Sequence, residues 1–169
     1  MTFLLVEHGG TAGANDFYVI KAFRGADNPR ELMETTNDVA ATPEVLTFSG
    51  NPNAPEGFTR RSAFVLAELA GGDIDHFAFD VAATEQVRVV CGSRSAGSGV
   101  VDLQVDLLDS TGLTTVASAT ETATEAALID GVSVPSAGRY LVRLTKASQD
   151  AVVTGAFVRC GFHLDTPAP

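Results

Sequence analysis

The sequence predicts an all-β fold, a jelly-roll-like antiparallel β-sandwich with an added N-terminal hairpin. Many short segments show apolar residues at every second position, and turns rich in Gly, Pro, Asn and Asp separate them. Almost no segment shows a helical stripe. The clearest alternation puts four apolar side chains on one face and three polar ones on the other: Val101, Leu103, Val105 and Leu107 against Asp102, Gln104 and Asp106. Such a strand fits one buried face and one solvated face.

Length and charge narrow the class of protein. A chain of 169 residues is long enough for one well-buried core. Its net charge of −10, from 21 acidic and 11 basic residues, repels nucleic acid and anionic membranes. No apolar run approaches the roughly 20 residues of a membrane-spanning helix, so no membrane insertion is expected. The first residues lack the basic region of a signal peptide, and their apolar stretch is too short for one.

The first 27 residues are predicted to form a β-hairpin. Phe3–Val6 and Phe17–Phe23 are rich in strand-forming residues, and the stretch Gly9–Asp16 between them is typical of a loop. Three interpretations remain open: extra edge strands of the same sandwich, strands exchanged with a neighbouring subunit, or the tail of a preceding domain.

The sandwich is predicted over residues 28–164, and residues 165–169 are expected to be a tail or linker. A single helical turn is possible near Pro29–Met33. A short strand at Val45–Phe48 and an exposed loop at Gly50–Gly57 are expected before the longer strands. The predicted longer strands are Ser62–Leu69, Phe77–Val81, Val87–Cys91, 101–107, Leu113–Ala117, Leu128–Val134, Arg139–Thr145 and Val152–Leu164.

One stretch is ambiguous. Ala117–Ala127 is rich in alanine, which favours a helix. Its threonines and its lack of an apolar stripe favour an edge strand or a loop.

Three motifs, in order, resemble the bacterial pre-peptidase C-terminal domain family, which is related to clostridial collagen-binding domains. They are Gly-Asp-Ile-Asp-His-Phe-Ala-Phe at 72–79, the strand and turn at 101–112, and Pro-Ser-Ala-Gly-Arg-Tyr-Leu-Val-Arg-Leu at 135–144. The resemblance covers residues 28–164 and implies an extracellular β-sandwich that accompanies secreted enzymes and surface proteins. His76 is a departure, because the family usually has Trp or Tyr there.

The resemblance also implies a calcium site. The matching oxygen ligands would be Asn37, Asp38, Asp73 and Asp75, with Glu34 one residue out of step because Thr35 takes the usual place of the glutamate. Carboxylates from two separate loops suit calcium, which binds six to eight oxygens. The alternative is turn chemistry, since Asn and Asp bond to their own backbone in turns.

Two cysteines are predicted to face the core. Cys91 shares the parity of Val87 and Val89, and Cys160 shares that of Val158 and Phe162. In a secreted domain such a pair indicates a disulfide between distant strands. Two separate buried thiols are the alternative. A zinc site is not expected, because there is no Cys-x-x-Cys motif and no nearby histidine pair.

No catalytic motif is present, so an enzyme is the least favoured of three hypotheses. His8, His76 and His163 are far apart in the sequence. The neighbouring acids of His76 can raise its pKa, but a structural role in place of the family's aromatic residue is favoured. Tyr140 is expected in the core or at a corner rather than against a ligand.

The resemblance and the composition together favour a non-catalytic extracellular module for polymer (polysaccharide or protein) binding or cell-surface attachment. The alternative is a structural subunit of an extracellular filament or surface layer, assembled by N-terminal strand exchange. The expected partners are an extracellular polymer or copies of the chain itself, with a homo-oligomer formed through residues 1–27. The expected location is extracellular or at the cell surface.

Overall fold

The computed structural model describes residues 36–69, 73–93, 102–146 and 157–169. These residues form ten β-strands and no helix. In chain order the strands are β1 (Glu44–Val45), β2 (Ser49–Asn51), β3 (Phe58–Glu68), β4 (Asp75–Val81), β5 (Gln86–Gly92), β6 (Leu103–Leu108), β7 (Thr115–Thr120), β8 (Ala127–Ser133), β9 (Gly138–Lys146) and β10 (Phe157–Pro167).

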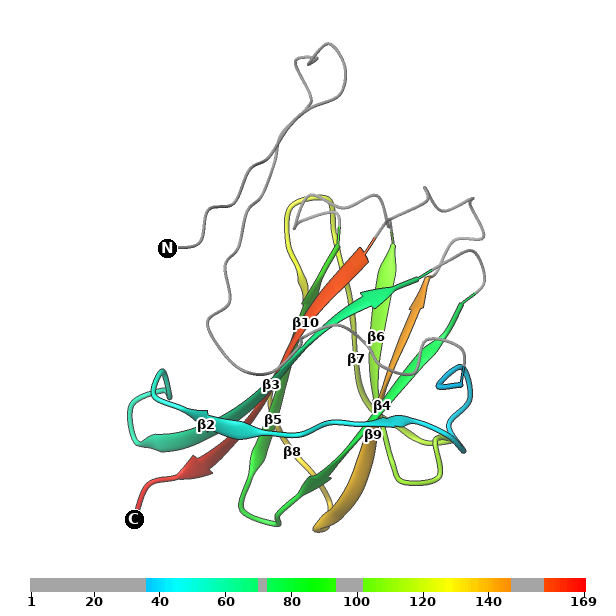
Figure 1. The fold of residues 1–169 in the computed structure, drawn as a ribbon. Helices are drawn as coiled ribbons and strands as arrows, with labels where there is room; N and C mark the ends of the chain where they lie inside the picture. Colours follow the sequence, from blue (N-terminus) through cyan, green and yellow to red (C-terminus); the bar gives the residue numbers. More distant parts are fainter. Residues whose placement is uncertain (1–35, 70–72, 94–101, 147–156) are drawn as a thin grey trace, which may run out of the picture.

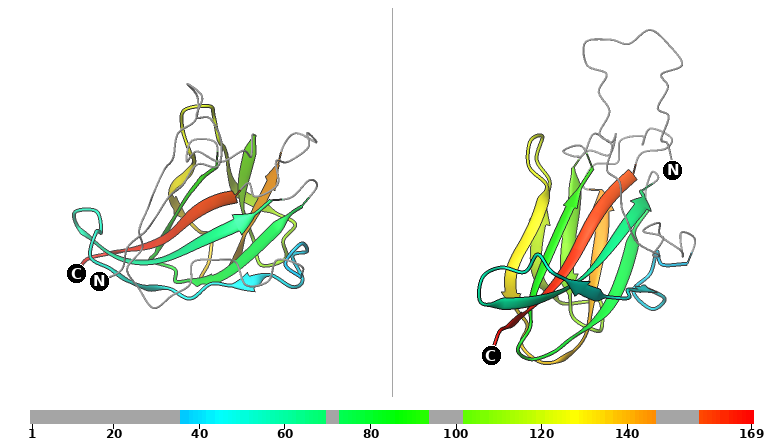
Figure 2. Two further views of the ribbon diagram at one scale, coloured as in Figure 1. Left: turned by 45° about the horizontal axis from the view of Figure 1, so that its top comes forward. Right: turned by 60° about the vertical axis from the view of Figure 1, so that its left-hand side comes forward.

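The strands form two five-stranded sheets that lie face to face (Figures 1 and 2). Sheet A has the order β2-β3-β10-β5-β8, and sheet B has the order β1-β4-β9-β6-β7. Neighbouring strands are antiparallel, except that β1 runs parallel to β4. The predicted all-β sandwich is therefore confirmed.

The chain crosses between the sheets on both sides of the sandwich. On one side it leaves β1 in sheet B and enters β2 in sheet A, as Figure 1 shows. Leu46 and Phe48 lie in this crossing and pack against the core. On the other side β7, at the edge of sheet B, contacts β8, at the edge of sheet A. These two crossings give the sandwich its jelly-roll-like form.

Aromatic rings from both sheets meet at the centre of the core. Phe77 and Phe79 of β4 lie 5.8 and 6.2 Å, centroid to centroid, from Phe162 of β10. Phe48 from the crossing segment lies 5.6 Å from Phe79. The period-two pattern at the start of β4 thus predicts correctly which side chains face inward.

The predicted boundaries around the crossing are wrong. Only Val45 of the predicted strand Val45–Phe48 belongs to a strand, because Leu46 and Phe48 bury their side chains in the gap between the sheets. The predicted loop at Gly50–Gly57 begins inside β2, where Gly50 and Asn51 pair with Arg61 and Arg60.

Strands β3 and β10 are longer than predicted. Strand β3 begins at Phe58, and β10 continues through Pro167, past the predicted sandwich boundary at residue 164. The two strands pair along their whole length, with Pro167 opposite Phe58. An ion pair between Arg60 and Asp165 ties this extension together. Proline is tolerated there because it lies at the end of the strand.

The ambiguous stretch after Gly112 is an edge strand followed by a turn. Strand β7 ends at Thr120, and Thr122 N–H donates to the carbonyl of Glu125 across 2.9 Å. Gly112 in the preceding turn has φ of 72°, and a Cβ there would lie 2.5 Å from the Cβ of Ala40. Both backbone conformation and space therefore require glycine at this position.

Several predictions lie outside the described residues. They are the hairpin at residues 1–27, the helical turn at 29–33 and the first part of the strand predicted at 152–164. Self-association through residues 1–27 therefore stays a prediction.

Deleting residues 1–27 should dissociate any large species that the intact chain forms. An exchanged strand supplies backbone hydrogen bonds to an acceptor sheet, and its loss removes them all. Sedimentation velocity of the intact and shortened chains checks this. Identical sedimentation coefficients for monomers in both samples would contradict strand exchange.

Candidate functional site

The structure brings only part of the predicted calcium site together. The carbonyl of Asn37 accepts the backbone N–H of His76 at 2.9 Å, so Asn37 lies against the start of β4. Asn37 and Asp75 are both fully buried. Asp73 is half-buried and its carboxylate accepts the N–H of Ile74 at 2.9 Å, while Asp38 is exposed.

Two further observations bear on that site. Glu34 lies outside the described residues. Within the described ranges, no group of three His, Cys, Asp or Glu side chains is arranged to hold a metal ion. The calcium site stays a prediction, one that would rely on the amide of Asn37 as well as on carboxylates.

The cysteines form a disulfide. Cys91 of β5 and Cys160 of β10 lie directly opposite each other in the register, with a Cα–Cα distance of 4.1 Å, and they are bonded. The two strands are far apart in sequence but are neighbours in sheet A. Both cysteines are buried in the core, as their parity predicts.

The outer face of sheet B carries a polar row in which His76 and Asp106 are buried, although a solvated face is predicted there. His76, Arg143, Asp106 and Ser118 lie opposite one another across β4, β9, β6 and β7. The carboxylate of Asp106 accepts from Ser118 at 2.6 Å, from Arg143 at 2.7 Å and from Gln104 at 3.0 Å. Burial alone would raise the pKa of Asp106, but these donors outweigh it and lower the pKa.

His76 belongs to that structural row. Burial, with the Arg143 charge, lowers its pKa, although its Nδ1 lies 3.1 Å from the carbonyl of Asn37. The expectation that neighbouring acids raise this pKa is therefore wrong. The favoured structural role agrees with its burial.

Tyr140 occupies a corner. It is buried, and its hydroxyl donates to the carbonyl of Ser136 at 2.8 Å. It helps to line a shallow hollow between the turns at residues 109–114 and 135–140. Asp109 in this hollow accepts from Thr111 and Thr114, which lower its pKa to about 2. That carboxylate shapes the turn, so we do not assign a ligand to the hollow.

The outer face of sheet A carries an apolar strip. Phe64 of β3, Gly161 of β10, Val90 of β5 and Leu128 of β8 lie opposite one another across four strands. Phe64 and Leu128 are each 44% exposed. We call these four residues the apolar strip.

Neighbouring side chains close over Gly161. A Cβ at this position would lie 3.1 Å from Nε2 of His163, 3.3 Å from the Phe64 ring and 3.4 Å from Val90. The ring of Phe64 also meets that of His163 edge to face, 5.8 Å between centroids. The strip is therefore continuous. The packing of Phe64, Val90 and His163 over residue 161 depends on the absence of a side chain there.

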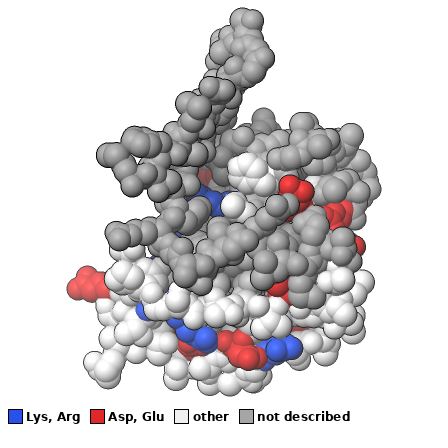
Figure 3. Space-filling view, in the orientation of Figure 1, with Lys and Arg blue, Asp and Glu red and all other residues white. Residues whose placement is uncertain are grey.

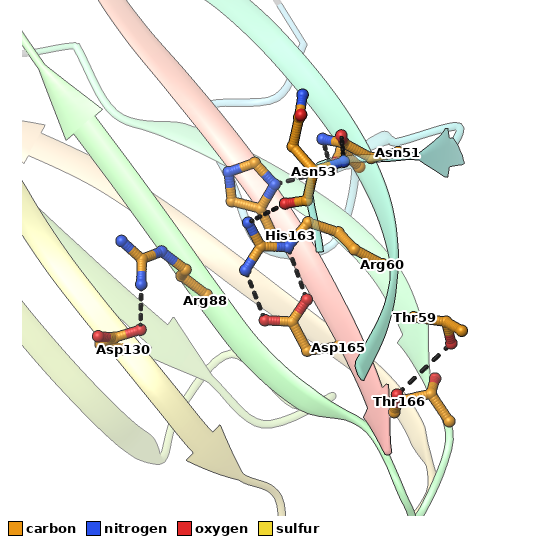
Figure 4. A network of polar contacts seen from close by, with 10 residues as sticks. Asn51, Asn53, Thr59, Arg60, Arg88, Asp130, His163, Asp165 and Thr166 are labelled. Atoms are coloured by element: carbon orange, nitrogen blue, oxygen red, sulfur yellow. Dashed lines mark hydrogen bonds and ion pairs between the residues drawn. The ribbon is translucent and has the colours of Figure 1, made fainter. Parts of the chain in front are cut away.

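A chain of hydrogen bonds fixes His163 beside the strip (Figure 4). The side-chain oxygen of Asn51 accepts the backbone N–H of Asn53 at 2.9 Å. The side-chain nitrogen of Asn51 therefore points to Ser62 and donates to the Ser62 Oγ at 2.9 Å. Nδ1 of His163 lies 2.7 Å from the Ser62 hydroxyl. Because Ser62 is buried and the described contacts offer its proton no other acceptor, we assign the hydroxyl as the donor. This order leaves the ring proton on Nε2, which is a hydrogen-bond donor beside Gly161.

Two ion pairs flank His163. Arg60 binds Asp165 through two parallel contacts of 2.6 and 2.7 Å, and Arg88 binds Asp130 at 2.6 Å (Figure 4). Burial lowers the pKa of His163 to about 4, and the charges of Arg60 and Arg88 add to the effect. The imidazole is therefore neutral at neutral pH.

The Ser62–His163 distance is that of the serine nucleophile and histidine base in a serine hydrolase, but these two residues lack the properties that such catalysis needs. Ser62 is only 4% exposed, and its oxygen already accepts a hydrogen bond from Asn51. A histidine with a pKa of about 4 is also a weak general base at neutral pH. The pair instead orients the Nε2–H donor toward the apolar strip.

The described part of the face in Figure 3 carries charges of both signs. Figure 3 shows Lys and Arg side chains lying among Asp and Glu side chains on the visible described surface, without a broad basic area.

Comparisons with known proteins give a distant structural likeness. No protein-family model matches the chain, and no curated protein matches it. It is similar in structure to Aeromonas hydrophila PliG, a periplasmic inhibitor of g-type lysozyme, with a TM-score of 0.47 and 14% identity over 73% of this chain and 94% of that chain. A likeness of this extent transfers no function, so the chemistry of the site comes from the residues themselves.

The apolar strip is missing from the sequence predictions. A signal for it exists in β3, where Phe64 and Leu66 alternate with the buried Ala63, Val65 and Ala67. A strand that is apolar on both faces predicts either full burial or a binding surface.

Proposed function

We propose that this protein is a non-catalytic extracellular module that binds a polymer, polysaccharide or protein, through the apolar strip of sheet A. The observation that carries the proposal is the outward-facing row of Phe64, Val90 and Leu128, of which Phe64 and Leu128 are exposed and Val90 is half-buried, with the Nε2–H donor of His163 at its border. Exposed apolar surface bordered by polar groups marks a site of interaction.

The form of the surface supports an extended ligand. The strip crosses four hydrogen-bonded strands, and a disulfide joins the central two, β5 and β10. The site is thus a rigid, open row rather than a closed pocket. A rigid surface loses little conformational entropy on binding, which suits weak, repeated contacts with a long polymer.

The disulfide supports an extracellular location. Such bonds form and persist in oxidising compartments and are rare in the cytosol. No helix of the described part of the chain is long and apolar enough to cross a membrane. The motif resemblance to the pre-peptidase C-terminal domain family also favours a secreted or surface-attached protein, and attachment to a cell-surface polymer is one form of the proposed binding.

Replacing Phe64 and Leu128 together by alanine should weaken polymer binding at least tenfold. Each truncation removes exposed apolar contact worth about 1 kcal/mol at an interface centre. Co-sedimentation with insoluble cellulose, chitin, peptidoglycan and collagen measures binding.

Leu113→Ala is the matched control, because Leu113 is 87% exposed but lies outside sheet A. Binding that falls equally in the control and in the double variant would contradict the proposal. Thermal melts of both variants establish that each one is folded.

The calcium proposal has its own test. If Asn37, Asp73 and Asp75 hold calcium, a calcium concentration about 100 times Kd should raise the free energy of unfolding by about 2.7 kcal/mol. Thermal melts in calcium and in chelator measure this shift, and Asp73→Asn should reduce it. Equal melting temperatures in calcium and in chelator would contradict the calcium proposal.

A further inference from the structure

Arg159 stands apart from the other described arginines. Five others each have a carboxylate partner: Arg60 with Asp165, Arg61 with Glu85, Arg88 with Asp130, Arg139 with Asp80 and Arg143 with Asp106. Within the residues that the structure describes, Arg159 makes no ion pair. The chain has 21 acids and 11 bases, so an arginine that pairs with no carboxylate of the described residues is unusual.

The position of Arg159 links it to the apolar strip. It faces outward from β10 between Leu66 of β3 and Gly92 of β5, and it is half-buried. Gly161 of the strip is two residues further along the same face. Successive residues on one face of a strand are about 7 Å apart, and diagonal neighbours such as Phe64 are within reach of a long side chain.

Donors therefore lie on both sides of the strip. Along β10, Arg159 precedes Gly161 by two residues, and His163 follows it by two. The guanidinium offers a planar pair of N–H groups that matches a carboxylate, and the imidazole offers one neutral Nε2–H. Between them the Phe64 ring and Val90 offer an apolar surface.

We propose that the polymer bound at this face is an acidic polysaccharide, whose sugar carboxylates bind Arg159 while the sugar rings pack on Phe64. This inference rests on the proposed polymer-binding function. A pyranose ring has a face of C–H groups that suits the negative face of an aromatic ring. Its hydroxyls accept from His163 Nε2, and its carboxylate neutralises the guanidinium.

The net charge of the chain does not prevent this binding. At about 0.15 M salt the Debye length is about 8 Å, so acids elsewhere on the surface are largely screened from a sugar at Arg159. A protein partner is less well matched, because a stable interface buries about 800 Å² on each side, whereas this strip is a single row with polar rows beside it.

Polygalacturonate and its methyl ester test the inference, because a methyl group on each carboxyl of the ester removes the charge and leaves the sugar rings unchanged. Wild-type protein should bind the acid form roughly tenfold more tightly than the ester. Arg159→Gln should abolish this preference and leave ester binding unchanged. Arg139→Gln makes the same charge change in sheet B and should retain the preference. Phe64→Ala should weaken binding of both polymers.

Each other outcome has a distinct meaning. Phe64-dependent binding of both polymers without an acid preference would overturn the acidic-sugar inference and leave the proposed function standing. Phe64-dependent binding of collagen alone would do the same and identify a protein ligand. An acid preference that persists in Arg159→Gln would also overturn the inference. Phe64-dependent binding of cellulose, chitin or peptidoglycan alone would overturn the acidic-sugar inference only. Binding of all the polymers tested, collagen included, that is absent or independent of Phe64 would overturn the proposed function as well.

Discussion

Replacing Cys91 and Cys160 together by alanine should lower the free energy of unfolding by about 3–4 kcal/mol. The bond links residues separated by 69 positions, and closing a loop of this length removes chain entropy worth about 4 kcal/mol from the unfolded state. Urea unfolding of the two proteins, followed by circular dichroism, measures the difference.

The same measurement on wild-type protein with a strong reductant is the internal control. Once unfolded and reduced, the wild type should refold with the stability of the double variant, within about 1 kcal/mol. A loss below about 1 kcal/mol in the double variant would mean that β5 and β10 are held together by their packing alone. Because Val90 and Gly161 are the next pair along these strands, the variant should also bind polymer more weakly.

Stability should fall by about 2–3 kcal/mol between pH 6.5 and pH 4, mainly because of His163. Its pKa is about 4 in the folded protein, whereas an unfolded histidine has a pKa near 6.5. Between these values the unfolded chain binds a proton that the folded chain does not, so stability rises with pH and is lost as pH falls. Groups facing His163 include Arg60, Arg88 and Asp165.

Urea unfolding at several pH values in this window checks the prediction. His163→Gln should remove most of the slope, because an amide does not titrate in this range. The glutamine oxygen can still accept from Ser62, so the variant should keep its fold. His76, whose pKa is also lowered, should leave a smaller slope of the same sign. Carboxylates such as Asp109 contribute at lower pH, since its pKa is about 2. Equal slopes for wild type and His163→Gln would contradict this account.

Much of the fold can be predicted from side-chain periodicity. The alternation at Phe77–Val81 identifies the inward face, and the parity of Cys91 and Cys160 places both sulfurs in the core. Periodicity reports which residues share a face, and a hydrophobic core enforces that choice strongly. The sandwich class follows because each sheet must bury its apolar face against the other.

Features that depend on pairing between distant strands cannot be predicted from the sequence alone. Asp106 has the parity of an exposed residue, yet it is 1% exposed because Arg143 and Ser118 reach it from neighbouring strands. Strand β2 contains Gly50 and Asn51, which disfavour strands, and it forms because β3 offers an edge. In both cases the register of the strands brings in partners that the local sequence does not indicate.

The candidate site shows the same limit. The apolar character of both faces of β3 is visible in the sequence, so a surface patch near Phe64 can be predicted. Its continuation through Val90 and Leu128 requires the order of the strands in sheet A. The position of Arg159 beside that strip, without a carboxylate opposite it, follows only from the register of β10 with β3 and β5.

The most direct test of the central claim is to map the ligand on the protein. At 17.6 kDa the chain is suited to NMR titration with a short oligosaccharide cut from the polymer that it retains. We expect the largest shift changes at Phe64, Val90, Leu128, Arg159 and the His163 ring, all on the outer face of sheet A. Changes that cluster instead on sheet B, or on the turns at residues 109–114 and 135–140, would contradict the assignment of this face.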